Sequence, residues 1–542
     1  MLTRQGVRHL DAAELIAAVL DPGSYRSWDG PVADPDPGPE YRQDLAAARA
    51  KTGVDESVLT GEGLIRGRRV AVIVSEFRFL AGSIGQAAAE RIVTAVERAT
   101  REGLPLLAGP ASGGTRMQEG TIAFLSMVKI SAAVRTHRQA GLPYLVYLRH
   151  PTTGGVMASW GSLGHITAAE PGALLGFLGP RVYEALHGNP FPENVQTAEN
   201  LFDKGLIDAV VPPRQLPDVV DRALSILATG TRLPVAPPVT LRAKPSGAGA
   251  WESIGISRNL RRPDVRQLLA HGAREVLPLN GTGQGEKDPG LQLALARFGQ
   301  ESCVVIGHTR PRPPRTAAVG QTAVEQVAVA QAAMGPASLR EARRGMRLAE
   351  ELGLPLVTVI DTAGAALSRE AEEGGLAGEI ARSLHELIGL NAPTVSVLLG
   401  QGAGGGALAL LPADRTIAAQ HAWLSPLPPE GASAIVHRST DFAPAMSAAQ
   451  GVNIAALHAN GLVEHIVDER PDAAGEAQAF CRRLGRAIEY ELAALASAGV
   501  TELLPRRLEK YRRLGSLQAP RAERRQPSEG HPSGDQPPDV RA

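Results

Sequence analysis

Short apolar runs alternate with Ala-rich amphipathic stretches along most of the chain, and the same arrangement occurs twice. In the first half, Gly-Leu-Pro at 103–105 and again at 141–143 precedes an apolar run. In the second half, Gly-Leu-Pro at 353–355 and Asn-Ala-Pro at 391–393 stand in the corresponding places, and the two prolines of each half are 38 residues apart. This regularity predicts a duplicated α/β unit in which parallel strands are joined by crossover helices.

Glycine-rich turns follow these apolar runs at matched positions. The first half has SGGTRMQEG at 112–120 and PTTGGV at 151–156, and the second half has DTAGA at 361–365 and GQGAGGGA at 400–407. Gly154 and Gly404 each follow the second proline of their half by 11 residues. A glycine turn that opens a helix can direct backbone N–H groups at one point and hold an oxyanion there. Two such turns suggest a reaction with two anions to stabilise.

The apolar pattern also predicts where the domains begin and end. The apolar run at 69–74 opens the first compact region, which closes near Val211, and the run at 302–307 opens the second, which closes near Asp468. We expect a helix near Asp11–Leu20 and another after residue 216. The expected segments are an N-terminal extension (1–60), a first domain (61–235), a linker (236–250), a second domain (251–515) and a disordered tail (516–542).

Composition excludes several classes of protein. The formal net charge is +0 with no long basic run, so nucleic acid is a poor candidate partner. Cys303 and Cys481 lie far apart in apolar contexts, which favours buried thiols in a reducing compartment, and no Cys pairs have zinc-ligand spacing. No signal-type segment or membrane-length apolar run is present. We therefore expect a soluble, cytoplasmic protein without a metal site.

Common catalytic motifs are missing from the sequence. It contains no nucleophile elbow, no phosphate-binding P-loop and no dinucleotide fingerprint in the right setting. The histidines are scattered, and capped or surface positions are the favoured interpretation for His165, His308, His421 and His437. Glu119 and Glu170 lie near turns but form no evident acid–base pair, and a place in the first turn of a helix suffices to explain Glu119. Backbone donors remain, and they suit enolate formation from a thioester.

Longer strings carry a resemblance to a known family. The first half, with SGGTRMQEG, HPTTGGVMASWGSLGHITAAEPGALLGFLGPRV and KGLIDAVVPP, resembles the β-type carboxyltransferase subunit of bacterial acetyl-CoA carboxylase. The second half, with LREARRGMRLAEELGLPLVTVIDTAGA, AEEGGLAGEIARSLHEL and GQGAGGGALAL, resembles the α-type subunit. The resemblance covers about residues 60–215 and 255–470. It implies two tandem crotonase-like domains of ββα superhelix type in one polypeptide.

The resemblance also implies a reaction and its site residues. Carboxybiotin arrives on a carrier protein and releases CO2, the biotin N1 atom removes the α-proton of acetyl-CoA, and the enolate attacks CO2 to give malonyl-CoA. Gly154 and Gly155 are expected to hold the thioester oxygen, and Gly405 and Gly406 the ureido oxygen of biotin, although the spacing from Pro393 favours Gly404 and Gly405 instead. The expected substrate-binding residues are Gly82, Ser83, Gly113, Gly114, Arg116, Gly364 and Ala407.

The chain departs from the family pattern in two places. The four-Cys zinc ribbon that usually begins the β-type subunit is missing, and Ala363 replaces the proline of the family's Asp-Thr-Pro-Gly-Ala turn. No biotin-attachment Met-Lys-Met and no ATP-binding signature are present, so we expect the biotin carboxyl carrier protein and biotin carboxylase to be separate chains. The basic string RPRPPR at 310–315 could meet CoA phosphates or could equally be a solvated loop.

Several alternatives stay open at this point. A biotin- or carrier-dependent decarboxylase subunit, of malonate or glutaconyl-CoA type, would share the fold and run the chemistry in reverse. A non-catalytic acyl-CoA-binding scaffold belongs to a different class, and the two intact glycine turns argue against it. The resemblance also implies a homodimer or higher homo-oligomer, with each active site between the first domain of one chain and the second domain of another.

Overall fold

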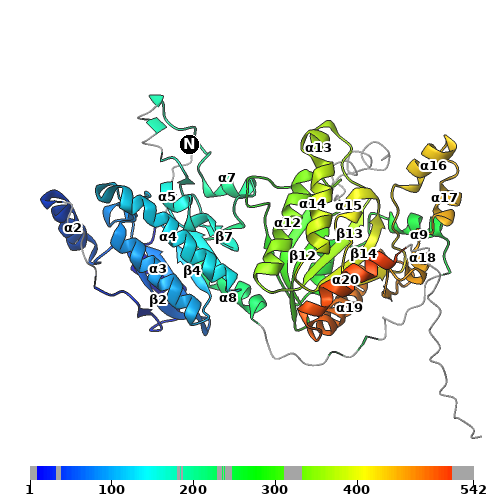
Figure 1. Cartoon of the computed structure of the whole chain (residues 1–542), viewed down its shortest axis with the longest axis horizontal. Coiled ribbons are helices and arrows are strands. Elements are labelled where there is room, and N and C mark those ends of the chain that lie inside the picture. Colours follow the sequence, from blue (N-terminus) through cyan, green and yellow to red (C-terminus); the bar gives the residue numbers. More distant parts are fainter. Residues whose placement is uncertain are drawn as a thin grey trace, which may run out of the picture.

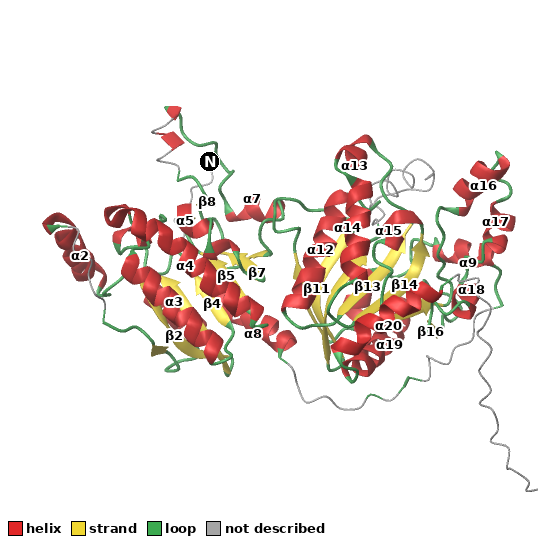
Figure 2. Ribbon diagram, viewed as in Figure 1, coloured by secondary structure: helices red, strands yellow, loops and turns green. Residues whose placement is uncertain are grey.

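The computed structural model contains two α/β domains side by side (Figures 1 and 2). It describes residues 9–31, 38–179, 183–184, 187–228, 235, 237–238, 247–310 and 333–514. The expected tail and most of the expected linker lie outside the described residues. No helix in these ranges is long and apolar enough to cross a membrane.

Seven strands form the sheet of the first domain, in the order β1-β2-β3-β4-β5-β7-β9. The first two pairings are antiparallel and the remaining four are parallel. The strands are β1 (Arg26–Ser27), β2 (Val58–Ile65), β3 (Arg68–Ser75), β4 (Leu106–Gly109), β5 (Tyr144–Leu148), β7 (Ile166–Ala169) and β9 (Ala209–Val210), and a small two-stranded sheet pairs β6 (Thr152–Thr153) with β8 (Leu175–Gly176).

Helices cover both faces of this sheet because its central strands, β4 and β5, are apolar and buried at every position. Ala71, Ile73 and Val146 face α3 and α4, which pack on each other, whereas Val72 and Tyr147 belong to the cluster that contains α1 and α8. The helices are α1 (Ala12–Val19), α2 (Pro39–Thr52), α3 (Gln86–Arg101), α4 (Gly120–Gln139), α5 (Gly154–Met157), α7 (Ala198–Asp203) and α8 (Leu216–Leu227), with 3-10 turns η1 (Leu80–Gly82), η2 (Met117–Glu119), η3 (Trp160–Ser162) and η4 (Pro213–Gln215).

The second domain repeats this arrangement strand for strand. Its order is β10-β11-β12-β13-β14-β15-β16, again with two antiparallel pairings followed by four parallel ones. The strands are β10 (Glu275–Leu279), β11 (Leu291–Phe298), β12 (Glu301–His308), β13 (Leu356–Thr362), β14 (Thr394–Gly402), β15 (Arg415–Ala419) and β16 (His465–Val467). The duplication predicted from the matched spacings is therefore confirmed at the level of topology.

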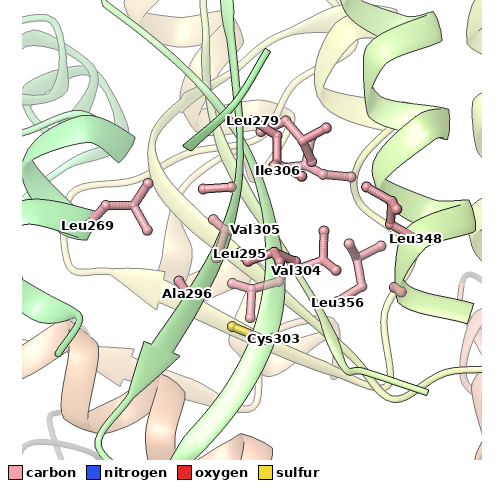
Figure 3. Close-up of a cluster of buried hydrophobic side chains, with 14 of the residues drawn as sticks. Leu269, Leu279, Leu295, Ala296, Cys303, Val304, Val305, Ile306, Leu348 and Leu356 are labelled. Atoms are coloured by element: carbon pink, nitrogen blue, oxygen red, sulfur yellow. The ribbon is translucent and has the colours of Figure 1, made fainter. Parts of the chain in front are cut away.

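The sheet of the second domain is also covered on both faces. Figure 3 shows Leu269 of α10 and Leu348 of α12 on opposite sides of β11 and β12, with Cys303 buried between the layers. The helices are α9 (Ala250–Ser257), α10 (Val265–Gly272), α12 (Pro336–Glu351), α13 (Arg369–Glu373), α14 (Leu376–Ile388), α15 (Gly404–Leu408), α16 (Pro429–His437), α17 (Ala443–Ala449), α18 (Ile454–Ala459), α19 (Ala477–Ala496) and α20 (Val500–Arg513).

Both cysteines are free and buried, as the sequence predicts. Burial in apolar surroundings raises the pKa of each thiol, that of Cys481 to about 12. These thiols therefore belong to the core and are not reactive groups.

Two expectations about organisation differ from the structure. Residues 1–60 do not form a separate extension where the structure describes them, because Leu15 of α1 packs in the core and β1 joins the first sheet. The sequence analysis also missed the antiparallel strands β2 and β11, each of which precedes an apolar run that it did identify. The turn between β2 and β3 contains Arg66 (φ 50°) and Gly67 (φ 78°), a conformation typical of a two-residue hairpin.

The two domains share one hydrophobic cluster. Leu216 and Leu224 of α8 belong to the same cluster as Leu277 and Leu279 of β10. The inner face of the first domain is thus covered partly by the second, and the two are packed together within one chain.

Candidate active site

The first glycine turn, residues 152–156, connects β6 to α5. Gly154 has φ +62°, and its N–H donates to the carbonyl of Phe177 at 2.9 Å. Thr153 N–H donates to the carbonyl of Ser112 at 2.8 Å, while the Ser112 hydroxyl accepts Gly114 N–H at 3.0 Å. These bonds fix the turn against the loop that follows β4.

The second glycine turn, residues 402–406, has the same construction. Gly404 also has φ +62°, and its N–H donates to the carbonyl of Ser425 at 2.9 Å. Ala403 N–H donates to the carbonyl of Thr362 at 3.1 Å, and the Thr362 hydroxyl accepts Gly364 N–H at 3.1 Å. Gly404 is therefore the structural equivalent of Gly154, and Gly364 of Gly114.

The equivalence extends to the next residue of each turn. Gly155 and Gly405 are half-buried, and within the described part of the chain neither N–H has a hydrogen-bond acceptor. The same holds for the N–H groups of Thr115 and Ala365, which belong to the facing loops. Each turn thus offers an unpaired N–H at the start of a short helix beside a second unpaired N–H, which is the arrangement of donors that an oxyanion requires.

Packing around the turns shows how closely the loops approach. A Cβ on Gly114 would lie 3.2 Å from Gly155 N, and a Cβ on Gly155 would lie 3.1 Å from the Thr115 hydroxyl oxygen. In the second domain a Cβ on Gly406 would lie 3.5 Å from Ala365 N. The facing loops therefore border the unpaired N–H groups directly.

Gly406 differs from Gly405 in its surroundings. It is buried and corresponds to Val156, whose side chain is fully buried in the first domain. The repeat therefore pairs Gly155 with Gly405, in agreement with the interpretation based on the spacing from Pro393. Ala407, expected to touch substrate, is also fully buried, so its side chain belongs to the core.

Arg116 does not point to a substrate in this structure. Its guanidinium is fully buried and donates to Glu56, to the Ser83 carbonyl at 2.7 Å and to the Tyr41 hydroxyl at 3.2 Å. Burial by itself would lower the pKa of Arg116. The hydrogen bonds to Glu56 and the negative charge of Glu56 have a larger effect, so the pKa of Arg116 is raised. The expected contact between Arg116 and substrate is therefore replaced by a structural role.

Gly82 and Ser83 lie in the loop after β3, which contacts the loop after β4. A Cβ on Gly82 would lie 2.1 Å from the Ala111 carbonyl oxygen, so this position requires glycine. The Ser83 hydroxyl donates to the Leu80 carbonyl at 2.7 Å and is nearly buried. Of the expected substrate-binding residues, Gly113 is exposed. Ser83 is instead part of the loop that supports the loop after β4, where its carbonyl accepts a hydrogen bond from Arg116.

Glu119 lies in the first turn of a helix, as the sequence predicts: it ends the one-turn 3-10 helix η2 and immediately precedes α4. A favourable place at the helix start does not suffice to explain it, however, because its buried carboxylate accepts the Tyr41 hydroxyl at 2.6 Å and Gln86 N–H. The sequence analysis missed Tyr41 and Glu56 altogether, because both lie more than fifty residues before their partners.

Arg310 has a similar role in the second domain. It is buried and donates to both carboxylate oxygens of Asp361, which in turn accepts Gln401 N–H at 3.0 Å. Arg310 is therefore not available to CoA phosphates, and residues 311–315 lie outside the described residues. The Arg310–Asp361 pair instead anchors the loop that leads to Gly364.

Three of the four candidate histidines are buried and so differ from the surface positions that the sequence favoured. His165 and His308 are almost fully buried, and burial lowers the pKa of each, that of His308 to about 4. His165 Nε2 lies 3.2 Å from a carboxylate oxygen of Glu351, a residue of the second domain. Both are neutral at physiological pH. His421 is buried and His437 exposed. In the ranges that the structure describes, no three His, Cys, Asp or Glu side chains are grouped as a metal site.

The chain matches two family models, one in each half. Residues 14–236 match the carboxyl transferase domain, and residues 246–515 match the acetyl co-enzyme A carboxylase carboxyltransferase-like family. The chain therefore belongs to the carboxyltransferase subunits of the biotin-dependent acyl-CoA carboxylases, with the β-type and α-type halves in one polypeptide.

Curated relatives agree with this assignment, and a solved structure agrees with the fold. The chain is 59% identical over 507 residues to a probable biotin-dependent acyl-coenzyme A carboxylase beta3 subunit of Mycobacterium tuberculosis, covering 93% of this chain and 98% of the relative. It is 35% identical to the acetyl-coenzyme A carboxylase carboxyl transferase subunits beta/alpha of Salinispora arenicola, covering 94% and 91%. The transcarboxylase 12S crystal structure is similar in fold, with a TM-score of 0.70 at 21% identity and 90% of each chain covered.

Proposed function

We propose that this protein transfers a carboxyl group to acetyl-CoA, forming malonyl-CoA, and that the donor is carboxybiotin on a separate carrier protein. The observation that carries the proposal is the pair of equivalent glycine turns, each with unpaired N–H groups. A reaction that generates two oxyanions needs two such sites. The named relatives support the acyl-CoA class, and the 35% identical acetyl-CoA carboxylase subunit supports the choice of acetyl-CoA.

The thioester side is assigned to the first domain. There the N–H groups of Gly155 and Thr115 would donate to the thioester oxygen and stabilise it as it becomes an enolate oxygen. Because the donors are backbone groups held by the bonds of Gly154 and Ser112, they need little reorganisation during the reaction. Loss of one such donor typically costs about 3–4 kcal/mol in the transition state. Gly113 is exposed and would leave room for the acyl group beside these donors, whereas Gly114 is buried against the turn.

The biotin side is assigned to the second domain. The unpaired N–H groups of Gly405 and Ala365 fit the ureido oxygen of biotin, because they repeat the donor pair of the first domain. When bound, the biotin group supplies the carboxyl group and a base for the α-proton of the thioester. Gly364 fixes the Ala365 N–H through the Thr362 hydroxyl, which accepts Gly364 N–H.

A complete site would need two copies of the chain. Figure 1 shows α5 and α15 in different domains, with α12 and α14 between them. Large apolar side chains are exposed in both domains, among them Met117, Phe124 and Val128 in the first and Leu367 and Ile435 in the second. A second copy could bury these surfaces and bring the first domain of one chain to the second domain of the other. Transcarboxylase 12S, the structural neighbour named above, is itself described as a hexamer assembly.

Two assays test the proposed function. The first measures biotin-dependent decarboxylation of malonyl-CoA by the purified chain with free biotin. The second measures carboxylation of acetyl-, propionyl- and long-chain acyl-CoA after biotin carboxylase, carrier protein and ATP are added. Carboxylation with the highest kcat/KM for acetyl-CoA supports the proposal, and preference for another thioester would revise the substrate. Decarboxylation without any carboxylation would favour a decarboxylase subunit, and acyl-CoA binding without either activity would favour a scaffold.

A further inference from the structure

A strained loop follows β3 and contacts the loop after β4, which in turn borders the first glycine turn. In this Ala81 loop, residues 79–85, two non-glycine residues have positive φ, Leu80 at 43° and Ala81 at 57°. Such a conformation is strained for a residue with a side chain and persists only where surrounding structure enforces it. The Ala81 carbonyl accepts Gly113 N–H at 2.9 Å, so the strained residue directly holds the loop after β4.

Helix α2 packs on this strained loop. Only three of its residues are buried, Tyr41, Leu45 and Ala48, and they form a cluster with Phe79, against which Leu80 also packs. The other positions of the helix are largely exposed. The apolar face of α2 is thus used for contact with the Ala81 loop and contributes little to the main core.

Tyr41 also connects α2 to the loop after β4. In this Gly113 loop, residues 112–119, the Glu119 carboxylate accepts the Tyr41 hydroxyl through one oxygen and Gln86 N–H through the other. Arg116 donates to the Tyr41 hydroxyl at 3.2 Å and to the Ser83 carbonyl at 2.7 Å. One phenol therefore joins a helix, the Ala81 loop and the Gly113 loop.

The network is buried, and Arg116 is the partner of two carboxylates, Glu56 and Glu119. Tyr41, Glu56, Arg116 and Glu119 are each less than a tenth exposed. Burial and the hydrogen bond to Glu119 raise the pKa of Tyr41, so the phenol remains a donor at physiological pH. Without the hydroxyl, the same Glu119 oxygen would keep only Arg116 at 3.4 Å, a weak contact for a buried carboxylate.

The close packing leaves little freedom at the start of α3. A Cβ on Gly85 would lie 2.2 Å from a Glu119 carboxylate oxygen and 2.9 Å from an Arg116 nitrogen. The Glu119 carboxylate is therefore in direct contact with the backbone of Gly85, which ends the Ala81 loop. Because this contact is tightly packed, a shift of Glu119 would also move the Ala81 loop.

We propose that α2 is a positioning element for the thioester site, and that the Tyr41 hydroxyl, through Glu119 and Arg116, holds the Ala81 and Gly113 loops in the geometry that places the Thr115 N–H beside that of Gly155. The inference rests on the proposed function for the identity of the substrate. Tyr41 acts through Glu119 and Arg116 and does not itself contact the reacting atoms. The alternative is that α2 contributes stability alone.

The test compares Tyr41→Phe with Gln43→Ala in the full-length protein. Phenylalanine keeps the ring against Phe79 and removes only the hydroxyl, whereas Gln43 is an exposed residue of the same helix. For Tyr41→Phe we expect a roughly five- to tenfold loss of kcat/KM for acyl-CoA, with KM for biotin unchanged. Gln43→Ala should match the wild type in both. Equal kcat/KM in Tyr41→Phe and wild type would overturn the proposal, and so would a loss shared by both variants.

Amide hydrogen exchange gives a second readout that does not depend on activity. In Tyr41→Phe, exchange should accelerate in peptides covering residues 79–86 and 111–120 and stay unchanged in residues 394–409 of the second domain. Faster exchange throughout the first domain would show that the hydroxyl contributes to the stability of the whole domain and would overturn the proposal. Unchanged exchange in both peptides would show that the hydroxyl does not restrain these loops, which would also overturn it. If the wild type were inactive with every acyl-CoA, the proposed function would fail while the exchange data would still decide whether α2 positions these loops.

Discussion

Arg344 of α12 donates to both carboxylate oxygens of Asp208, which immediately precedes β9 in the other domain, at 2.9 Å each. The same carboxylate accepts Asn280 N–H at 3.0 Å and Thr167 N–H at 2.9 Å. The Asp208 side chain is only 3% exposed. The two domains are therefore joined by a buried, fully hydrogen-bonded ion pair as well as by apolar packing.

Removing one partner of this pair should weaken the joint between the domains. Arg344→Met leaves the buried Asp208 carboxylate without its counterion, and we expect the variant to lose about 3 kcal/mol of unfolding free energy. Thermal unfolding measures the loss as a lower Tm. The double variant Asp208→Asn, Arg344→Met should recover part of it, because no uncompensated charge remains. A Tm equal to that of the wild type in Arg344→Met would show that the pair contributes nothing.

The sequence predicted the repeated α/β architecture because its signals are local and periodic. The apolar strands, the prolines before them and the glycines at φ +62° each occupy fixed places in the repeat, so spacing alone related Gly154 to Gly404. The strands β2 and β11 lacked this support, since each pairs antiparallel with its neighbour and no crossover helix separates them.

The support of the site could not be predicted in the same way. Tyr41 and Glu119 are 78 residues apart, and nothing periodic connects them. Arg116 stands in a glycine-rich loop, where an exposed cation facing a CoA ester is a natural expectation, yet tertiary packing buries it beside Glu56. Buried polar networks depend on which loops the fold brings together, and that information is not local in sequence.

A branched side chain at either equivalent glycine should stop carboxyl transfer. In Gly155→Val the new Cβ would lie 3.1 Å from the Thr115 hydroxyl oxygen and the methyl groups would fill the space beside the N–H donors. In Gly405→Val the Cβ would lie 2.7 Å from Ile380, whose flexible side chain can move. We expect kcat to fall at least about a hundredfold in each, as for the loss of an oxyanion donor.

The two variants should differ in which substrate they fail to use. Gly155→Val should impair the response to acyl-CoA and Gly405→Val the response to biotin, which titration of each substrate at saturating concentrations of the other would measure. Circular dichroism and Tm check that both variants are folded. Near-normal turnover in either one would require the two-oxyanion interpretation to be abandoned.

Gly406→Ala separates the two possible assignments of the biotin site. A Cβ at Gly406 would have ordinary contacts, 3.5 Å to Ala365 N and 3.7 Å to the Met334 sulfur, so the fold should accept it. If Gly405 is the donor, Gly406→Ala should keep KM for biotin within about twofold of the wild type, whereas Gly405→Ala should raise it. The opposite result would assign the donor to Gly406.

Stability should fall as the pH drops from about 6.5 to about 4, because His308 is buried in its neutral form. Its pKa in the folded protein is about 4, against 6.5 when exposed, so the unfolded chain binds a proton that the folded chain does not. Stability is therefore lost as pH falls through this window, by about 3 kcal/mol for this one group. The Tm of His308→Asn, measured from pH 7.5 to 4.5, should depend less steeply on pH than that of the wild type. Parallel profiles would show that His308 does not titrate as its burial implies.

An exposed apolar face on α4 should be necessary for assembly and activity. Phe124 is 62% exposed and Val128 is 68% exposed on the helix that follows the loop carrying Thr115, and in the proposed assembly a second copy buries them. We expect Phe124→Asp to shift the protein toward monomer in light scattering, because a charge buried without a partner opposes association. Activity should fall in parallel, since each site would lose the domain supplied by the other copy. Ala47→Asp places the same charge on an exposed position of α2 and should leave both mass and activity unchanged. A wild-type protein that is fully active as a monomer, or a Phe124→Asp variant that dissociates without loss of activity, would show that one chain contains a complete site.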